Sequence, residues 1–326
     1  MELIRNHFRK VNSGIFILIV IGTSLFFVSE FHRNWKSLQS ASLQIHFSGI
    51  LLAFSLIMLS YVLMTIAWHV GISAFPAKWK TTIAESFAIV NTTQLTKYIP
   101  GKVWSYALQM YLLASKGVPK SYVVYINLVT SLSGVLMNFL CAPFLLLFCA
   151  KRFPYPVVLL VLFVCIAGYS SFVFFNGNMV AYCVGITNRL FQRKMVFYKL
   201  SLSTVLKIQV LVFGVNFAFA GAGCAAFYGA GFTLSGSNLA LVSIGVLLAD
   251  SIGFIILISP AGIGIREGIM YAVLYGVVDK NSALVLPIVL RVLSMSSDLV
   301  LGTLAYFLYH SFKIKEKTGS SDHQDF

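Results

Sequence analysis

The chain has 326 residues, of which 58% are hydrophobic and only 10% are charged, and its mean hydropathy is +0.86. Soluble domains carry about 25% charged residues, so this composition excludes a soluble globular protein and predicts an all-α protein that crosses a membrane several times. The net charge of +14 does not indicate a nucleic-acid partner, because Lys and Arg fall mainly in short loops and tails, the distribution that orients membrane helices.

The five cysteines and six histidines form no C-x-x-C or H-x-x-x-H pattern. We therefore expect no metal site and no cofactor. No arrangement of Ser, His and Asp, or of Cys and His, indicates nucleophilic catalysis.

A basic N-terminus leads into an apolar run at 14–31, which has the length of one membrane-spanning helix. The run is too long for a cleaved signal peptide and no A-x-A-like site follows, so we interpret it as the first transmembrane helix with a cytoplasmic N-terminus. A second run covers 47–75. The segment 81–115 is too polar for a lipid-facing span and too apolar for a loop. It predicts a re-entrant helical hairpin broken at Pro100 and Gly101.

The rest of the chain holds one amphipathic segment, five further apolar runs and a polar tail. The segment 176–199 carries four basic residues among apolar ones and predicts a cytoplasmic amphipathic helix on anionic headgroups. The polar tail at 313–326 is expected to be cytoplasmic and disordered, leaving 1–312 as one integral membrane domain. The remaining apolar runs lie at 122–150, 155–175, 200–230, 239–278 and 284–309.

The run 239–278 is broken at Pro260, in the same style as the break at Pro100. Three crossings lie between the two breaks, and because three is odd the two hairpins enter from opposite sides of the membrane. The loops that this count makes cytoplasmic hold most of the Lys and Arg. We predict six full crossings plus two broken hairpins in an inverted repeat, with both termini cytoplasmic. In the alternative, each broken element spans fully and the chain has eight spans.

The second break combines two features that are costly inside a bilayer. Pro260, Gly262 and Gly264 cannot continue a membrane helix, and Arg266 and Glu267 follow at once. Irregular backbone at membrane depth is tolerated only where it is buried in protein or lines a wet cavity. A charge at a helix centre costs about 2.5–3.5 kcal/mol on insertion scales. The combination predicts a functional site.

Short helices are expected to start after Pro100 and after Gly264. A helix start binds anions through its unpaired N–H groups and its positive dipole end. Lys97, Lys102 and Arg266 lie at these starts, where a cation disfavours the dipole, so they are not present for helix stability. An anion between the two starts would satisfy both. In the alternative interpretation, Arg266 pairs with an intramembrane acid and only locks the hairpin.

The charges at membrane depth nearly balance, as expected when buried charges pair. Arg291 and Asp298 are seven residues apart on one helical face, too far for a direct pair, so each is expected to pair elsewhere. Asp250 is assigned to the functional cavity, with a purely structural bridge as the alternative. The charges considered are Glu85, Lys97, Lys102, Lys207, Asp250, Arg266, Glu267, Arg291 and Asp298.

The small residues at 221–226 faintly match a dinucleotide-binding loop. They lie inside an apolar run with no strand pattern after it, so we interpret them as a close helix-packing surface. The candidate substrate-binding residues are Lys97, Tyr98, Pro100, Gly101, Lys102, Asp250, Pro260, Gly262, Gly264, Arg266, Glu267, Arg291 and Asp298.

Three stretches resemble a known family. Residues 97–104 read Lys-Tyr-Ile-Pro-Gly-Lys-Val-Trp, residues 111–118 read Tyr-Leu-Leu-Ala-Ser-Lys-Gly-Val, and residues 259–268 read Ser-Pro-Ala-Gly-Ile-Gly-Ile-Arg-Glu-Gly. They are similar to the signature segments of the lysylphosphatidylglycerol synthase transmembrane-region family, also described as flippase-like integral membrane proteins. The resemblance runs from the first helix to the last. Lys102 departs from it, because many relatives have a small residue there.

The resemblance implies a plasma-membrane protein of a bacterium or archaeon. Family members fused to a soluble aminoacyl transferase are associated with translocating the aminoacylated phospholipid, and stand-alone members with envelope lipid or polysaccharide pathways. Only a short tail follows Tyr309, so we expect no lysyl-transfer chemistry and no enzyme activity. The resemblance makes a membrane lipid or a lipid-linked glycan the expected substrate and envelope-biosynthesis enzymes the expected partners.

The hypothesis is a lipid flippase in which Lys97, Lys102 and Arg266 replace the hydration of an anionic headgroup while nearby carboxylates hold these cations. Two other classes stay open. A membrane-embedded transferase acting on a lipid phosphate would use Asp250 or Glu267 as its base. An accessory subunit would use the broken helices to dock a partner enzyme.

Overall fold

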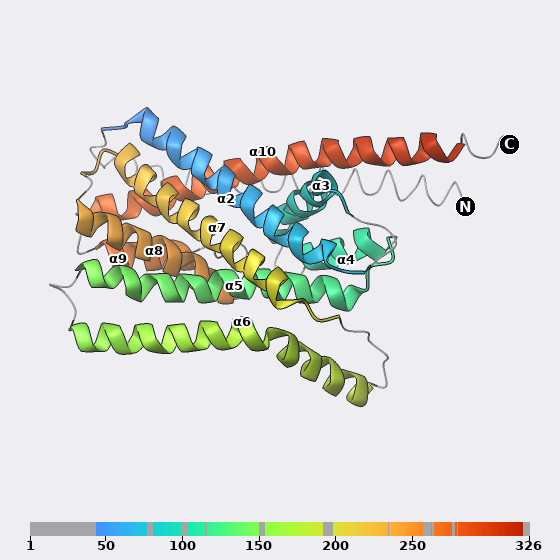
Figure 1. Ribbon diagram of the computed structural model, residues 1–326. Coiled ribbons are helices and arrows are strands. Elements are labelled where there is room, and N and C mark those ends of the chain that lie inside the picture. Colours follow the sequence, from blue (N-terminus) through green and yellow to red (C-terminus); the bar gives the residue numbers. More distant parts are fainter. Residues whose placement is uncertain are drawn as a thin grey trace.

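A computed structural model gives the arrangement of the helices, and the described residues contain no strand (Figure 1). The structure describes residues 44–76, 81–98, 104–114, 116–149, 154–191, 198–233, 235–256, 262, 264–275, 278 and 280–321. The elements are α2 (Phe47–Ser73), α3 (Ile83–Gln94), η1 (Leu95–Tyr98), α4 (Trp104–Ala114), α5 (Lys120–Leu146), η2 (Leu147–Cys149), α6 (Tyr155–Phe191), α7 (Leu202–Gly229), α8 (Gly236–Ile255), α9 (Ile265–Leu274) and α10 (Lys280–Ser321).

Six of the described helices are long and apolar enough to cross a membrane, which confirms the class of an all-α, multi-pass membrane protein. They are not the same six that the sequence predicts. The predicted span at 14–31 lies outside the described residues. In its place stands α8, whose 20 residues extend about 30 Å, the thickness of the hydrocarbon core. The second broken element is therefore unequal, with one long and one short arm.

The first predicted break falls between two short helices, and the second falls between the long α8 and the short α9. α3 has 12 residues, α4 has 11 and α9 has 10, so each extends less than about 20 Å and reaches only part of the way through a bilayer. α3 starts at a capping box, in which the Thr82 hydroxyl accepts from the Glu85 backbone N–H and the Glu85 carboxylate accepts from the Thr82 N–H. Pro100 and Pro260 themselves lie outside the described residues.

The two broken elements occupy opposite ends of the bundle. In Figure 1, α3 and α4 lie in the right half, toward which the C-terminal end of α10 points, and α8 and α9 lie in the left half. α10 packs against both broken elements, since it contacts α3 and η1 of the first and α9 of the second. This arrangement agrees with two hairpins that enter from opposite membrane faces.

The tightest helix pair is α2 with α7, and glycine allows the approach. A Cβ placed on Gly49 would lie 2.6 Å from the Cα of Gly229, which is closer than real Cβ contacts. In α7, Ala222 and Ala226 are fully buried, and a Cβ on Gly223 would meet the Val246 side chain of α8 at 2.4 Å. The predicted role of residues 221–226 in close helix packing is confirmed.

Two predicted boundaries were wrong, both because an amphipathic segment continues a membrane helix. α6 runs unbroken to Phe191 over 37 residues and bends in its last part, so the predicted separate helix at 176–199 is largely its extension (Figure 1). α10 runs to Ser321, so the tail expected to be disordered is helical up to that residue. A helix that is already nucleated is extended one residue at a time without the cost of a new nucleus, so these flanking segments continue α6 and α10.

Candidate functional site

The first ion pair of the site joins the two arms of the second broken element. Asp250 lies in the last turns of α8 and Arg266 in the first turn of α9, and Nη2 of Arg266 is 2.9 Å from Oδ1 of Asp250. Gly262 (φ +73°) and Gly264 (φ +79°) have backbone angles that other residues adopt only with strain, and they turn the chain between the two helices. A Cβ on Gly253 would lie 2.6 Å from Cγ of Arg266, so a glycine is needed there for the arginine to pack.

The second ion pair joins η1 of the first broken element to α10. Nζ of Lys97 is 2.7 and 2.8 Å from the two carboxylate oxygens of Asp298, and the Tyr98 hydroxyl donates to Oδ2 of Asp298 at 2.6 Å. The Asp298 side chain is only 3% exposed. The Lys97 ammonium also lies 5.3 Å from the ring centre of Tyr61 in α2, within the range of a cation–π contact.

The third ion pair joins α9 to α10, because Arg291 donates from Nη1 to Oε1 of Glu267. Arg291 and Asp298 lie on the same face of α10 and neither pairs with the other. The prediction that each would pair elsewhere is confirmed, with Glu267 and Lys97 as the partners.

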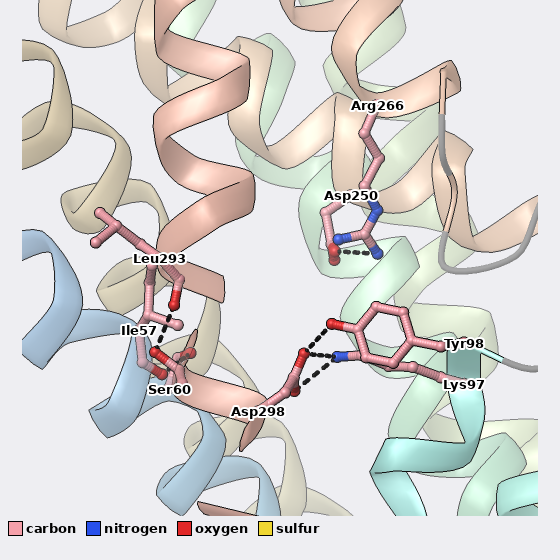
Figure 2. A network of polar contacts seen from close by, with 9 residues as sticks. Ile57, Ser60, Lys97, Tyr98, Asp250, Arg266, Leu293 and Asp298 are labelled. Atoms are coloured by element: carbon pink, nitrogen blue, oxygen red, sulfur yellow. Dashed lines mark hydrogen bonds and ion pairs between the residues drawn. The ribbon is translucent and has the colours of Figure 1, made fainter. Parts of the chain in front are cut away.

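All three pairs line one cavity of about 100 Å³, which we call the charged cavity. Figure 2 shows Arg266 and Asp250 facing each other, while Lys97 and Tyr98 both point at Asp298. Segments far apart in the sequence thus bring their polar side chains to one place in the bundle. Seven predicted site residues line the charged cavity: Lys97, Tyr98, Asp250, Arg266, Glu267, Arg291 and Asp298.

The other predicted residues take different positions. Gly262 and Gly264 shape the turn before α9 and do not line the charged cavity. Pro100, Gly101, Lys102 and Pro260 lie outside the described residues.

Two charges that the sequence put at membrane depth belong elsewhere. Glu85 caps α3 and pairs with Lys116, 3.0 Å away. Its charge therefore stabilises the start of α3 and joins it to the turn that follows α4. Lys207 is exposed on the outer side of α7 and lines only an apolar surface groove. Neither residue lines the charged cavity.

Sequence reasoning missed several residues of this cavity. Tyr61 and Phe219 line it from α2 and α7, and Ser294 and Met295 line it from α10. Each sits in an apolar run where a tyrosine, a serine or a methionine is ordinary. Ser294 could have been found, because it lies between Arg291 and Asp298 on the same helix face.

The charged cavity has no net formal charge, but some of its polar atoms lack hydrogen-bond partners among the described residues. Three cations face three carboxylates, so the formal charges of these six residues cancel. Arg266 is bound through one terminal nitrogen, and among the described residues its Nε has no hydrogen-bond partner. Oε2 of Glu267 likewise has none within the described ranges. A guanidinium carries five donors, so a single contact with Asp250 leaves Arg266 able to bind a further acceptor.

The start of α9 adds a second source of positive potential. Its N-cap is Gly264, which has no side chain with which to cap the first backbone N–H groups. Unpaired N–H groups at a helix start favour an anion, and Arg266 sits in this same turn. The pairing of Arg266 with Asp250 also agrees with the alternative in which the arginine locks the hairpin. The two roles are compatible, because the pair lines the cavity.

A comparison with protein families finds one match. The family described as "Lysylphosphatidylglycerol synthase TM region" matches residues 15–302, which is most of the chain. No curated protein matches the chain. The match spans all three ion pairs and both broken elements.

Proposed function

Because the chain belongs to the lysylphosphatidylglycerol synthase transmembrane-region family, we propose that it is a lipid translocase. Its cargo would be the headgroup of an anionic phospholipid or a lipid-linked glycan, carried across the plasma membrane during envelope or polysaccharide biogenesis. The observation that carries the proposal is the charged cavity between the two broken elements, lined by three ion pairs.

The energetic problem of a flippase is the phosphate. An isolated ion moved from water into a medium of low dielectric costs tens of kcal/mol in the Born limit, so a headgroup does not cross hydrocarbon unaided. Fixed donors inside the protein lower this cost by replacing the lost water. Arg266 binds Asp250 through Nη2 and its side chain is 35% exposed, and the Lys97 side chain is 28% exposed. The lipid tails would stay in the bilayer throughout.

The carboxylates give the cavity its second property, which is neutrality when empty. A cavity holding three unpaired cations would itself be expensive at membrane depth. With Asp250, Glu267 and Asp298 in place, each cation is held until an anion competes for it. We propose transport rather than catalysis, because this exchange of partners needs no bond to form or break.

The broken elements supply a way to move. The short helices α3, α4 and α9 can tilt against the long helices α2, α5 and α7 without unfolding a membrane span, and α9 does so about the turn at Gly262 and Gly264. Opposed broken helices that meet near the midplane are a recurring design of membrane transporters, in which one repeat rocks against the other.

Flipping of a labelled anionic lipid in reconstituted vesicles tests the proposal. Wild-type protein is expected to accelerate flipping over empty vesicles, and Arg266→Ala to lower the rate about 10–100-fold, the effect of losing a hydrogen bond to a charged group. Arg266→Ala leaves Asp250 unpaired, which by itself destabilises the protein, so Arg266→Ala/Asp250→Ala is measured beside it. Lys207→Ala is the matched control, because Lys207 is an exposed cation of α7 that does not line the cavity. Flipping no faster than in empty vesicles, or equal rates in all variants, refutes the proposal.

A further inference from the structure

A second cavity, of about 250 Å³, opens beside the charged cavity, and we call it the polar chamber. Both are lined by Lys97, Asp250, Arg266 and Asp298, so the two spaces share their charged wall. The volume equals about eight waters at about 30 Å³ each, which is enough for a single sugar ring or a small polyol. The chamber lies among α2, α3, α4, α5 and α7.

Away from the shared wall, the described lining of the polar chamber has hydrogen-bonding side chains but no charge. Asparagine and glutamine inside a membrane bundle are costly unless they bind something, and these come from four different helices. Their burial is nearly complete: Gln109 is 1% exposed, Asn127 4%, Asn91 5% and Asn216 7%. Some of them hydrogen-bond to one another across helices, since Asn127 donates to Gln109 Oε1 at 2.7 Å and Gln109 donates to Thr93 Oγ1 at 3.0 Å, so what a ligand could bind is set by the polar atoms that these bonds leave unused.

The orientation of the asparagines shows what the chamber offers to a ligand. Asn91, Asn127 and Asn216 each donate from Nδ2 to a backbone carbonyl, at 3.0, 2.9 and 3.3 Å. A carbonyl can only accept, so these bonds fix which end of each amide is nitrogen. Among the described residues, the amide oxygen of all three is left without a donor. The chamber therefore presents acceptors to whatever enters it.

An independent observation points the same way. Trp68 of α2 lines the polar chamber and is only 3% exposed, yet its indole N–H has no partner among the described residues. A buried indole N–H normally finds an acceptor. Trp68 thus lines the chamber with an unsatisfied donor, although its nitrogen is fully covered in this conformation.

The group that matches this lining is one rich in hydroxyls, since a hydroxyl both donates and accepts. We propose that the polar chamber binds a neutral, hydroxyl-rich part of the headgroup, a sugar ring or a polyol, while the charged cavity binds the phosphate to which it is attached. The inference rests on the proposed function and narrows its substrate class. A headgroup that ends in a bare phosphate would leave the buried amide oxygens without a donor. A cationic headgroup would find no carboxylate in the chamber beyond the shared wall.

The test compares three lipids with the same chains and label, each in phosphatidylcholine vesicles containing the purified protein. Phosphatidylinositol carries a ring of hydroxyls, phosphatidylglycerol carries a short polyol, and phosphatidic acid carries the phosphate alone. Wild-type protein is expected to flip at least one of the first two about tenfold faster than phosphatidic acid, the effect of one or two neutral hydrogen bonds. Preference for phosphatidylinositol identifies a ring as the occupant, and preference for phosphatidylglycerol identifies an open polyol.

Variants tie the preference to the chamber. Asn127→Leu and Asn216→Leu, on α5 and α7, are expected to lower the rate for the preferred lipid to that for phosphatidic acid and to leave the phosphatidic acid rate unchanged. Asn138→Leu is the matched control, because Asn138 is 1% exposed in α5 and does not line the chamber. Tryptophan fluorescence in detergent adds a readout that needs no transport. Phosphatidylinositol should change the signal of wild-type protein, and Trp68→Phe should lose that change.

The results separate this inference from the proposed function. If the protein flips none of the three lipids, the translocase itself is refuted. If it flips phosphatidic acid as fast as the other two, or if Asn127→Leu and Asn138→Leu behave alike, the translocase stands and the role of the polar chamber is refuted.

Discussion

The ion pair of Lys97 and Asp298 gives the sharpest energetic test of the site. Asp298 is 3% exposed and is held by the Lys97 ammonium at 2.7–2.8 Å and by the Tyr98 hydroxyl at 2.6 Å. The change Lys97→Met keeps the length and apolar stem of the side chain and removes its charge. Asp298 then faces the bundle interior with Tyr98 as its remaining donor in the described part of the chain.

The structure sets the size of the effect. Removing one partner of a buried ion pair costs about 3–5 kcal/mol, because the other charge is left uncompensated. Tyr98 still donates one hydrogen bond to the carboxylate and Lys97 is 28% exposed, so the lower end, about 3 kcal/mol, is expected. The double change Lys97→Met/Asp298→Asn removes both charges and keeps an acceptor for Tyr98. It should cost about 1 kcal/mol or less, since neutral replacement of a buried pair is often tolerated.

Reversible unfolding in mixed micelles of mild detergent and dodecyl sulfate measures these free energies. The coupling energy between the two positions should be about 2 kcal/mol or more. Lys207→Met, at an exposed position of α7, is the control and should stay within about 0.5 kcal/mol of wild type. A coupling energy below about 0.5 kcal/mol would mean that Lys97 does not hold Asp298 as an anion. The description of the charged cavity as a set of mutually compensating pairs would then be wrong.

Two glycine substitutions test the packing on which the site depends. Gly253→Ala should displace the Arg266 side chain, because Cγ of Arg266 lies 2.6 Å from the new Cβ. The variant is expected to flip lipid about tenfold more slowly or worse and to lose about 1–3 kcal/mol of unfolding free energy. Equal flipping rates in this variant and in wild type would contradict the reasoning. Gly49→Ala should lower the unfolding free energy by more than about 3 kcal/mol in the same assay, because the new Cβ would meet the backbone of Gly229 and no side chain can move aside. A loss below about 1 kcal/mol would refute the close contact between α2 and α7. Gly268→Ala is the control for both, since its Cβ meets nothing within 4 Å and a helical Gly→Ala change gains about 0.5–1 kcal/mol.

The sequence predicted the helical class and both breaks because these depend on local chemistry. A run of apolar residues of bilayer length can only be a span, and proline with glycine and charge cannot continue one. The pairing of charges could be predicted only in part. The periodicity of α10 showed that Arg291 and Asp298 share a face and need other partners. It could not show that the partner of Asp298 is Lys97, which lies 201 positions earlier in the chain. That contact depends on how the first broken element packs against α10.

The polar chamber was beyond sequence reasoning for a related reason. Asn127 and Asn216 are single polar residues within apolar runs, and the average hydropathy of a span hides them. Asn91 and Gln109 lie in the segment 81–115, which the sequence marks only as too polar for a span. What makes a chamber is that all four line one cavity, which is set by the register of four helices and not by any local pattern.

The presence of three ion pairs in one cavity is hard to explain by stability. Replacing a buried pair with apolar residues of similar volume is often neutral or stabilising by about 1–4 kcal/mol, so a bundle selected for stability alone would carry leucine or methionine at these positions. Each pair also joins two elements across a break or against α10, namely α8 with α9, α9 with α10 and η1 with α10. Under the proposed function, a pair such as Arg266 with Asp250 exchanges its carboxylate for a phosphate, which an apolar contact cannot do. Exchange at one pair would, under the proposed function, loosen the junction it holds and would link the arrival of a headgroup to movement of the broken elements.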